Sequence, residues 1–108
     1  MEVICEVMKL KPDSVKDYVE MHKNSSQELI RAIRESGFVE EYIYLLGNLV
    51  IVIMKCENFE KSRKRLLENG IFQQWTEKVQ RMLMEDEDLF NSREKIIDLK
   101  PLWNLKDF

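Results

Sequence analysis

Hydrophobic and polar residues alternate loosely over residues 2–10, in a stretch rich in valine, isoleucine and methionine. Alternation with a period of two is typical of a strand that has one face on a core. Residues 12–14 (Pro-Asp-Ser) then form a helix-start signal. Apolar residues recur at helical spacing from there to about Ser36, and Gly37 is a typical residue at a helix end. The N-terminal third therefore predicts a strand followed by a helix.

The predicted helix contains one polar segment, Asn24-Ser25-Ser26, that can interrupt it. Serine and asparagine favour caps and turns over helix interiors. Ser25 followed three residues later by Glu28 matches a capping box, in which the two side chains satisfy free backbone N–H groups. We expect the helix to restart at this point.

Two β-rich segments follow, Phe38 to Leu46 and Leu49 to Glu57, and only Gly47-Asn48 separates them. Two turn-forming residues between two strands predict a hairpin. Asn58 is placed to cap a second helix, which is expected to end at Asn69-Gly70.

The last third of the chain predicts another helical stretch and a final strand. The apolar face of the helical stretch is marked by Phe72, Trp75, Val79, Met82 and Leu83. The tail from Ile96 to Leu105 is rich in apolar residues and predicts a strand. Pro101 confines part of that strand to an edge or a bulge, because proline has no N–H to give to a ladder.

The order strand, helix, strand, strand, helix pair, strand predicts an α+β fold, the ferredoxin-like βαββαβ arrangement. With 108 residues, the chain is long enough for one domain, residues 1–108, and too short for two. Residues 50–53 (Val-Ile-Val-Ile) are apolar at both parities of their strand. Because helices cover only one face of such a sheet, we expect a homodimer in which a second copy covers the other.

Composition excludes several classes of protein. Hydrophobic content of 44% and charged content of 34% are typical of a globular domain. A net charge of -3 gives no reason to expect a nucleic-acid partner, and the basic segment 61–65 is offset by Glu60 and Glu68. The longest apolar run, residues 45–54, is broken by Gly47-Asn48 and is too short to span a bilayer. We therefore expect no membrane partner.

The two cysteines, Cys5 and Cys56, lie in apolar stretches, and the N-terminus lacks the features of a signal peptide. Reduced thiols and a cytoplasmic location are the expectation. One histidine and two cysteines at unrelated spacings do not make a zinc site, so no metal is predicted. The chain also lacks a glycine-rich phosphate loop and any cofactor fingerprint. Chemistry without a cofactor, or no chemistry, remains.

The candidate catalytic residues are Tyr18 and His22, the only histidine in the chain. They lie four residues apart on the predicted helix, so their side chains should be neighbours on its apolar face. An imidazole titrates near neutral pH and is suited to general acid–base catalysis. Each residue alone is also explained by packing in a core, and both interpretations stay open on the pattern alone.

Further residues could contact a substrate. Trp75 offers an aromatic face of the kind that packs on the C–H face of a sugar, and Thr76 beside it offers a hydroxyl. On the second predicted strand, alternation places Tyr42 and Tyr44 on one face and Glu41 on the other. Packing explains Trp75 and an exposed surface explains Glu41, so these are candidate substrate contacts only.

Taken together, the motifs resemble the L-rhamnose mutarotase family over nearly the whole chain. The matching residues are Lys11-Pro12-Asp13, Tyr18-x-x-x-His22, Glu28-Leu29, Gly37, Ile43-Tyr44-Leu45, Asn48-Leu49, Gln74-Trp75 and Leu102-Trp103. Their order and spacing carry the resemblance, since none is specific alone. It implies a dimeric α+β barrel that interconverts the α and β pyranose anomers of a sugar without a cofactor, an isomerase of the epimerase class.

The resemblance also implies roles for individual residues. His22 would be the proton donor, Tyr18 a substrate contact, and position 41 and a Trp-Trp pair would contact the sugar. Here position 41 is Glu41 where the family usually has tyrosine, and the second tryptophan of the pair is Thr76. Ser26 stands where the family has a tryptophan soon after the histidine. With three aromatic walls changed, L-fucose fits the pattern as well as L-rhamnose does.

Mutarotation requires one proton to leave the anomeric hydroxyl and another to reach the ring oxygen. We expect His22 to donate to the ring oxygen, with Tyr18, Glu41 or a bound water as its partner. Two other functions fit the same fold: a cofactor-free monooxygenase or haem-degrading enzyme, and a non-catalytic domain that binds a sugar or another small ligand.

Overall fold

The computed structural model of the protein describes all residues from 1 to 108. The strands are β1 (Glu2–Leu10), β2 (Phe38–Leu46), β3 (Leu49–Cys56), β4 (Leu83–Met84) and β5 (Ile96–Leu99). The α-helices are α1 (Val15–Lys23), α2 (Gln27–Glu35), α3 (Phe59–Leu67), α4 (Gly70–Met82) and α5 (Glu87–Phe90). Single 3-10 turns lie at η1 (Pro12–Ser14) and η2 (Leu105–Asp107).

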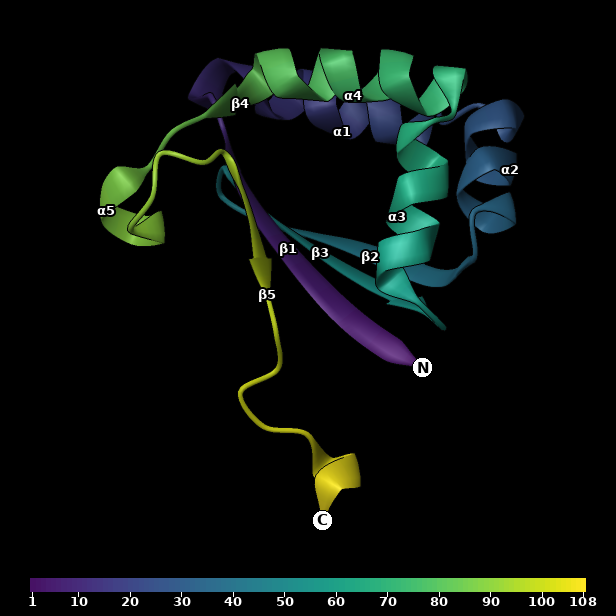
Figure 1. The fold of residues 1–108 in the computed structure, drawn as a ribbon. Helices are drawn as coiled ribbons and strands as arrows, with labels where there is room; N and C mark the ends of the chain where they lie inside the picture. The colour runs from purple at the N-terminus through teal and green to yellow at the C-terminus, as the bar shows by residue number, and fades with distance from the viewer.

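All five strands belong to one sheet, in which every pairing is antiparallel (Figure 1). The strand order is β2-β3-β1-β4, and β5 also pairs with β1. The first strand thus lies between the hairpin and the C-terminal strands. This is the ferredoxin-like α+β arrangement, so the predicted fold class is confirmed.

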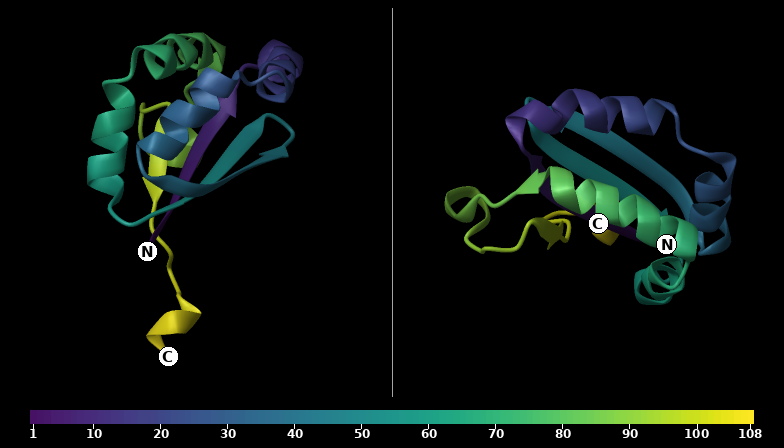
Figure 2. Two further views of the ribbon diagram at one scale, coloured as in Figure 1. Left: turned by 90° about the vertical axis from the view of Figure 1, so that its right-hand side faces the viewer. Right: turned by 90° about the horizontal axis from the view of Figure 1, so that it is seen from above.

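Helices cover one face of the sheet (Figures 1 and 2). α1 and α4 are set apart from one another in Figure 2, and the rings of His22 and Trp75 meet between them. Alternate residues of the strands face these helices, because side chains along a strand point to opposite sides of the sheet. The buried sheet residues at this parity are Met8, Leu10, Val50, Val52, Met54 and Cys56. The opposite face carries no helix; its side chains on β1 and β3 are mostly half-buried, and those on β2 are exposed.

The helix predicted over residues 12–36 is broken, as expected, near Asn24, but its second half is capped by a different residue. Ser26, not Ser25, is the N-cap of α2, and its hydroxyl accepts a hydrogen bond from the N–H of Leu29 at 3.1 Å. Ser25 instead donates its hydroxyl to the carbonyl of His22 at 2.7 Å. The predicted capping box is therefore wrong by one residue, because Ser25 closes α1 and is not free to open α2.

Asn58 caps α3 as predicted. The ends of the two following helices differ from the sequence prediction. α3 ends at Leu67, and Asn69, which was expected to end that helix, is instead the N-cap of α4 and accepts from the N–H of Phe72 at 3.1 Å. Leu83 was expected on the apolar face of a helix. It lies instead in β4, opposite Leu10 of β1, and is fully buried. Its burial against a strand explains why helical spacing alone misplaced it.

The final strand is shorter than predicted. β5 ends at Leu99, and the residues from 100 onward run away from the body of the molecule to the C-terminus (Figure 1). Pro101 has no N–H for the ladder, so pairing stops before it. Trp103 and Phe108 stack with ring centroids 5.5 Å apart, yet they are 62% and 88% exposed.

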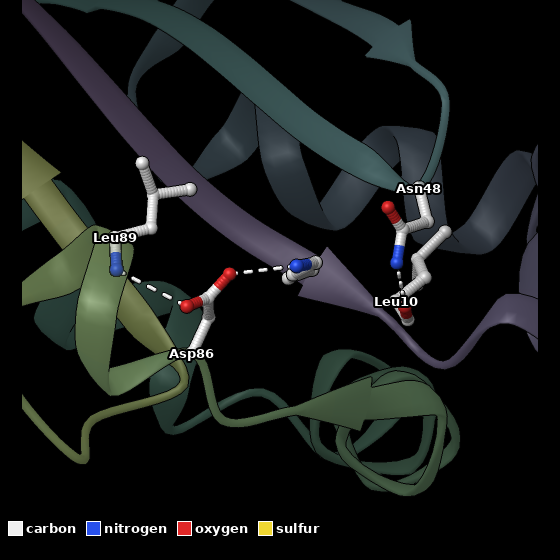
Figure 3. Close-up of polar contacts among 5 residues, drawn as sticks. Leu10, Asn48, Asp86 and Leu89 are labelled. Atoms are coloured by element: carbon white, nitrogen blue, oxygen red, sulfur yellow. Dashed lines mark hydrogen bonds and ion pairs between the residues drawn. The ribbon is translucent and has the colours of Figure 1, made fainter.

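Polar contacts fix the end of β1, where the chain enters the site-bearing helix (Figure 3). Asn48, in the hairpin turn, donates its side-chain amide to the carbonyl of Leu10 at 2.8 Å. Lys9 pairs with Asp86 at 2.6 Å, and Asp86 also accepts from the N–H of Leu89 at 3.1 Å. These contacts tie the hairpin and the start of α5 to the same strand end. Among the helices, none combines the length and the apolar character needed to cross a bilayer.

Candidate active site

A cavity of about 160 Å³ lies between the helices and the covered face of the sheet. Thirteen of its 18 lining residues are hydrophobic, so the few polar groups in it stand out. Those that titrate or donate hydrogen bonds are Glu6, Tyr18, His22, Glu41, Arg63, Trp75 and Thr76. An apolar cavity with a few convergent polar groups is the usual form of a small-molecule site.

The His22 imidazole is held in place on α1. Its Nδ1 lies 2.7 Å from the carbonyl oxygen of Tyr18, one turn earlier. Because a carbonyl can only accept, Nδ1 carries a proton in this contact. The ring also packs against Tyr18, with centroids 4.1 Å apart, and edge-on against Trp75 at 4.9 Å. The other ring nitrogen, Nε2, has no partner in the protein and is available to a ligand in the cavity.

Burial changes the acid–base properties of both residues. It lowers the pKa of His22 below its ordinary value, although the hydrogen bond to the Tyr18 carbonyl acts in the opposite direction. The imidazole is therefore neutral at neutral pH, and Nε2 then has a free lone pair. Burial, with the charges of Glu41 and Glu6, raises the pKa of the Tyr18 phenol. Tyr18 thus stays protonated and can act as a hydrogen-bond donor.

On α4, Trp75 and Thr76 both line the cavity, as the sequence suggested for a contact surface. Trp75 presents its ring edge to His22 and is part of the apolar wall. The Thr76 hydroxyl donates to the carbonyl of Phe72 at 2.8 Å, so it is left with its acceptor lone pairs for a ligand.

The residues predicted on β2 divide between the two faces of the sheet. Glu41 and Ile43 line the cavity, and burial of the Glu41 carboxyl raises its pKa. Tyr42 and Tyr44 were predicted as substrate contacts, but the structure places them outside the cavity. They are 50% and 55% exposed on the opposite face, because alternate residues of a strand face opposite sides.

Two cavity residues, Glu6 and Arg63, were not singled out from the sequence. The signal for Glu6 was present: it shares its parity on β1 with Met8 and Leu10, which are buried. A charged residue on the apolar face of a strand indicates a partner or a function. Arg63 lies in the basic segment of α3, which composition alone describes as an exposed face.

Glu6 belongs to a short chain of charged groups. It lies directly opposite Asp98 in the pairing of β1 and β5, and their side chains are hydrogen-bonded. Arg63 on α3 pairs with Asp98 at 2.8 Å. Two carboxyl groups share a hydrogen bond only if one of them keeps its proton. Burial first, and then the charge of Asp98, raise the pKa of Glu6 to about 7, while Arg63 acts in the opposite direction.

This raised pKa makes stability depend on pH. A carboxyl whose pKa rises on folding stabilises the protein when it is protonated, and that contribution is lost as pH rises toward the folded pKa. We expect the contribution of Glu6 to the unfolding free energy to fall by on the order of 3 kcal/mol between pH 4.5 and pH 8. The measurement is urea unfolding of wild type and Glu6→Gln at both pH values.

The difference between the two proteins is the informative quantity, because His22 and Glu41 titrate as well. Glu6→Gln should gain stability over wild type as pH rises, whereas the exposed control Glu35→Gln should follow wild type throughout. A constant difference between wild type and Glu6→Gln across this range would show that folding does not raise the pKa of Glu6.

The arrangement provides an acid and a base inside one apolar cavity. His22 offers a lone pair at Nε2, and Glu6 offers a carboxyl that keeps its proton to near neutral pH. Low dielectric around both groups strengthens their interaction with a bound polar molecule. No group of three or more His, Cys, Asp or Glu side chains is placed to hold a metal ion.

Comparison with known proteins identifies a matching family. A family model described as L-rhamnose mutarotase matches residues 3–105. Among curated proteins, none matches the sequence. The match covers nearly all of the chain, including every element that lines the cavity.

Solved structures share the fold. An L-rhamnose mutarotase from Formosa agariphila is 21% identical, with a TM-score of 0.73 over 97% of this chain and 99% of that one. A putative antibiotic biosynthesis monooxygenase from Nitrosomonas europaea is 15% identical, with a TM-score of 0.65 over 95% and 100%. A dimeric ferredoxin-like protein from an uncultured marine organism is 10% identical, with a TM-score of 0.59 over 91% and 83%. At these identities the likeness concerns the fold alone.

Proposed function

The chain belongs to the L-rhamnose mutarotase family, and from this we propose that it interconverts the α and β pyranose anomers of a 6-deoxy sugar such as L-rhamnose or L-fucose. The observation that carries the proposal is the position of the His22 imidazole. Its Nδ1 is fixed on a backbone carbonyl and its Nε2 is left to the cavity. A histidine that served packing alone would not need a cavity in front of its free nitrogen.

The apolar walls support a sugar that is less polar than a common hexose. Trp75, Phe72 and Ile43 line the cavity, and such side chains suit the C–H face and the methyl group of a 6-deoxy sugar. Tyr18, Glu41 and Thr76 supply the polar groups that hydroxyls require. Glu41 and Thr76 replace aromatic residues that are usual in the family, so the preferred sugar need not be L-rhamnose.

In the proposed reaction, His22 exchanges a proton with the sugar through Nε2. The neutral imidazole first takes the proton of the anomeric hydroxyl, and the ring opens to the aldehyde as the bond to the ring oxygen breaks. After the aldehyde rotates, the imidazolium returns the proton as the ring closes on the other face. This differs from the role expected from the sequence, in which His22 donates to the ring oxygen, because an imidazole that holds its one proton at Nδ1 has none at Nε2 to give. No metal or cofactor takes part in this scheme.

Anomer exchange measured by NMR magnetisation transfer tests the function. The exchange rates of L-rhamnose, L-fucose, D-glucose and D-galactose should be compared with and without enzyme, since all four equilibrate slowly in water. We expect acceleration for one of the two 6-deoxy sugars and little for the others. A sugar that binds in saturation-difference spectra without faster exchange would instead identify a binding domain.

We also propose that the enzyme is a cytoplasmic homodimer formed through the uncovered sheet face. Tyr42 and Tyr44 are half-exposed on that face, and Val3 of β1 is also exposed there. These exposed aromatic and aliphatic side chains favour an interface between two copies of the chain. Both cysteines are free thiols, which is compatible with a reducing compartment.

A charge on this face should separate the copies. Tyr44→Glu would bury a carboxylate without a partner, and we expect the dimer dissociation constant to rise at least 100-fold. Light scattering after size exclusion would then give the mass of one chain for Tyr44→Glu and of two chains for wild type and Tyr44→Phe. A wild-type protein with the mass of one chain at micromolar concentration would contradict the proposed dimer.

A further inference from the structure

We propose that Glu6 is a second catalytic residue, which exchanges a proton with the ring oxygen of the sugar while His22 exchanges one with the anomeric hydroxyl. The inference rests on the proposed function and names the partner that the mechanism requires. It is carried by the placement of Glu6 in the cavity and by the charged groups that hold it.

Glu6 and His22 reach the cavity from opposite walls. Glu6 is on β1, in the sheet, and His22 is on α1, in the helix layer (Figure 2). Both line the same small cavity, so a bound sugar ring would lie between them. Mutarotation needs proton transfer at two different oxygens of one ring, and groups on two walls can serve both at once.

Asp98 and Arg63 position the Glu6 carboxyl. Arg63 pairs with Asp98 at 2.8 Å, and Asp98, directly opposite Glu6 in the pairing of β1 and β5, shares a side-chain hydrogen bond with the Glu6 carboxyl. Asp98 lies outside the cavity lining and Glu6 lies in it. A ring oxygen arriving in the cavity would therefore compete with Asp98 for the Glu6 proton. In this scheme Asp98 and Arg63 are positioning residues.

The other two carboxyl or hydroxyl candidates are less suited to the role. Glu41 also lines the cavity, but it has neither an ion pair nor a hydrogen bond in the protein to orient it. Tyr18 is buried beside both carboxyls, and the resulting rise in its pKa makes the phenol a weaker acid than usual. A phenol with a raised pKa is a poor general acid, but it can still donate a hydrogen bond to a substrate.

The proton movements balance without any further reactant. In ring opening, the O–H bond of the anomeric hydroxyl breaks and its proton goes to Nε2 of His22, while the electron pair of that O–H bond becomes the second bond of the aldehyde C=O. The bond between the anomeric carbon and the ring oxygen breaks, and that oxygen takes its electron pair and the proton of Glu6. In ring closure, Glu6 carboxylate takes the proton back and the His22 imidazolium protonates the aldehyde oxygen.

This assignment predicts a bell-shaped pH profile for kcat/KM. The acid limb reports protonation of His22, and the alkaline limb reports ionisation of Glu6 near pH 7. The groups that face Glu6 are Asp98 from β5, Arg63 from α3, Glu41 from β2 and Tyr18 from α1. Of these, Glu41 also has a raised pKa, so its ionisation would contribute to the alkaline limb as well, and variants must distinguish the two carboxyls.

The experiment compares Glu6→Gln, Glu6→Asp and Glu41→Gln with wild type, using magnetisation transfer on the better of L-rhamnose and L-fucose. Glutamine keeps the size and the hydrogen bond to Asp98 but cannot transfer a proton. We expect kcat to fall at least tenfold in Glu6→Gln, with KM changed less than threefold and the alkaline limb gone. In Glu6→Asp the alkaline limb of the pH profile should remain but at a different pH from wild type. In Glu41→Gln it should lie at the same pH as in wild type.

Clear outcomes separate this inference from the proposed function. If wild type is active and Glu6→Gln retains both its kcat and its alkaline limb, the inference is overturned and the function stands. If Glu6→Gln does not fold by circular dichroism, Glu6→Asp decides, because an alkaline limb unmoved in that variant would also overturn the inference. If wild type does not accelerate the anomer exchange of any sugar, the proposed function is overturned, and the inference that rests on it is overturned with it. Glu35→Gln, exposed on α2, is the matched control and should equal wild type.

Discussion

Replacing His22 with alanine should reduce the enzyme's acceleration of anomer exchange by ~10²–10⁴-fold, the usual contribution of a positioned acid–base group. The variant removes the imidazole, whose Nε2 has no partner in the protein, from the cavity lining. His22 is half-buried on α1, so the fold should survive. Exchange rates by magnetisation transfer, corrected for the uncatalysed rate, measure the effect, and circular dichroism confirms that the variant is folded.

Tyr18→Phe is the companion variant for this prediction. It keeps an aromatic ring against His22 and leaves the backbone carbonyl that orients Nδ1. If Tyr18 is a substrate contact, KM should rise several-fold with kcat largely retained. A loss of kcat in Tyr18→Phe as large as that in His22→Ala would make the phenol a proton-transfer group. Acceleration within twofold of wild type in His22→Ala would remove the imidazole from the mechanism.

Substitution of Gly37 should produce the largest loss of stability. Gly37 has φ = +112°, a conformation that residues with a side chain rarely adopt. An added Cβ would also lie 2.6 Å from the hydroxyl oxygen of Ser62, which is buried on α3. Backbone strain of about 1–3 kcal/mol and overpacking of similar size predict that Gly37→Ala loses about 3 kcal/mol.

Gly70→Ala is the matched control. Gly70 begins α4, has no positive φ, and has nothing within 4 Å of the added Cβ. Alanine there should leave stability unchanged or slightly raised. Thermal unfolding of the two variants should therefore differ by roughly 10–20 °C for a domain of this size. A difference below about 3 °C would mean that the turn into β2 relaxes easily and that Gly37 is not required there.

Most of the fold could be predicted because two periodicities are clear in the sequence. The period of two in residues 2–10 and around Gly47-Asn48 predicts the strands, and the spacing of Tyr18 and His22 predicts a shared helix face. Helix boundaries were less predictable, since Ser25 and Ser26 are equally good caps and only the competing bond to the carbonyl of His22 decides between them. Leu83 was misplaced because its partner, Leu10, lies in another element.

The candidate site was predictable only in part, for a similar reason. His22, Glu41, Trp75 and Thr76 could be proposed from local spacing and from family resemblance, and all four line the cavity. Glu6 depends on a partner far along the chain, and no local pattern links it to β5. Which face of β2 meets the cavity is fixed by packing of the helices, and this places Tyr42 and Tyr44 on the outer face of the protomer.

The central claim is that the sugar binds directly against the His22 imidazole. Because His22 is the only histidine, its ring protons give a single pair of NMR signals that needs no assignment. Titration with L-rhamnose and L-fucose should shift these signals in a saturable way, with a midpoint that matches the KM for anomer exchange. Ring signals that stay unchanged at sugar concentrations that saturate catalysis would contradict the account.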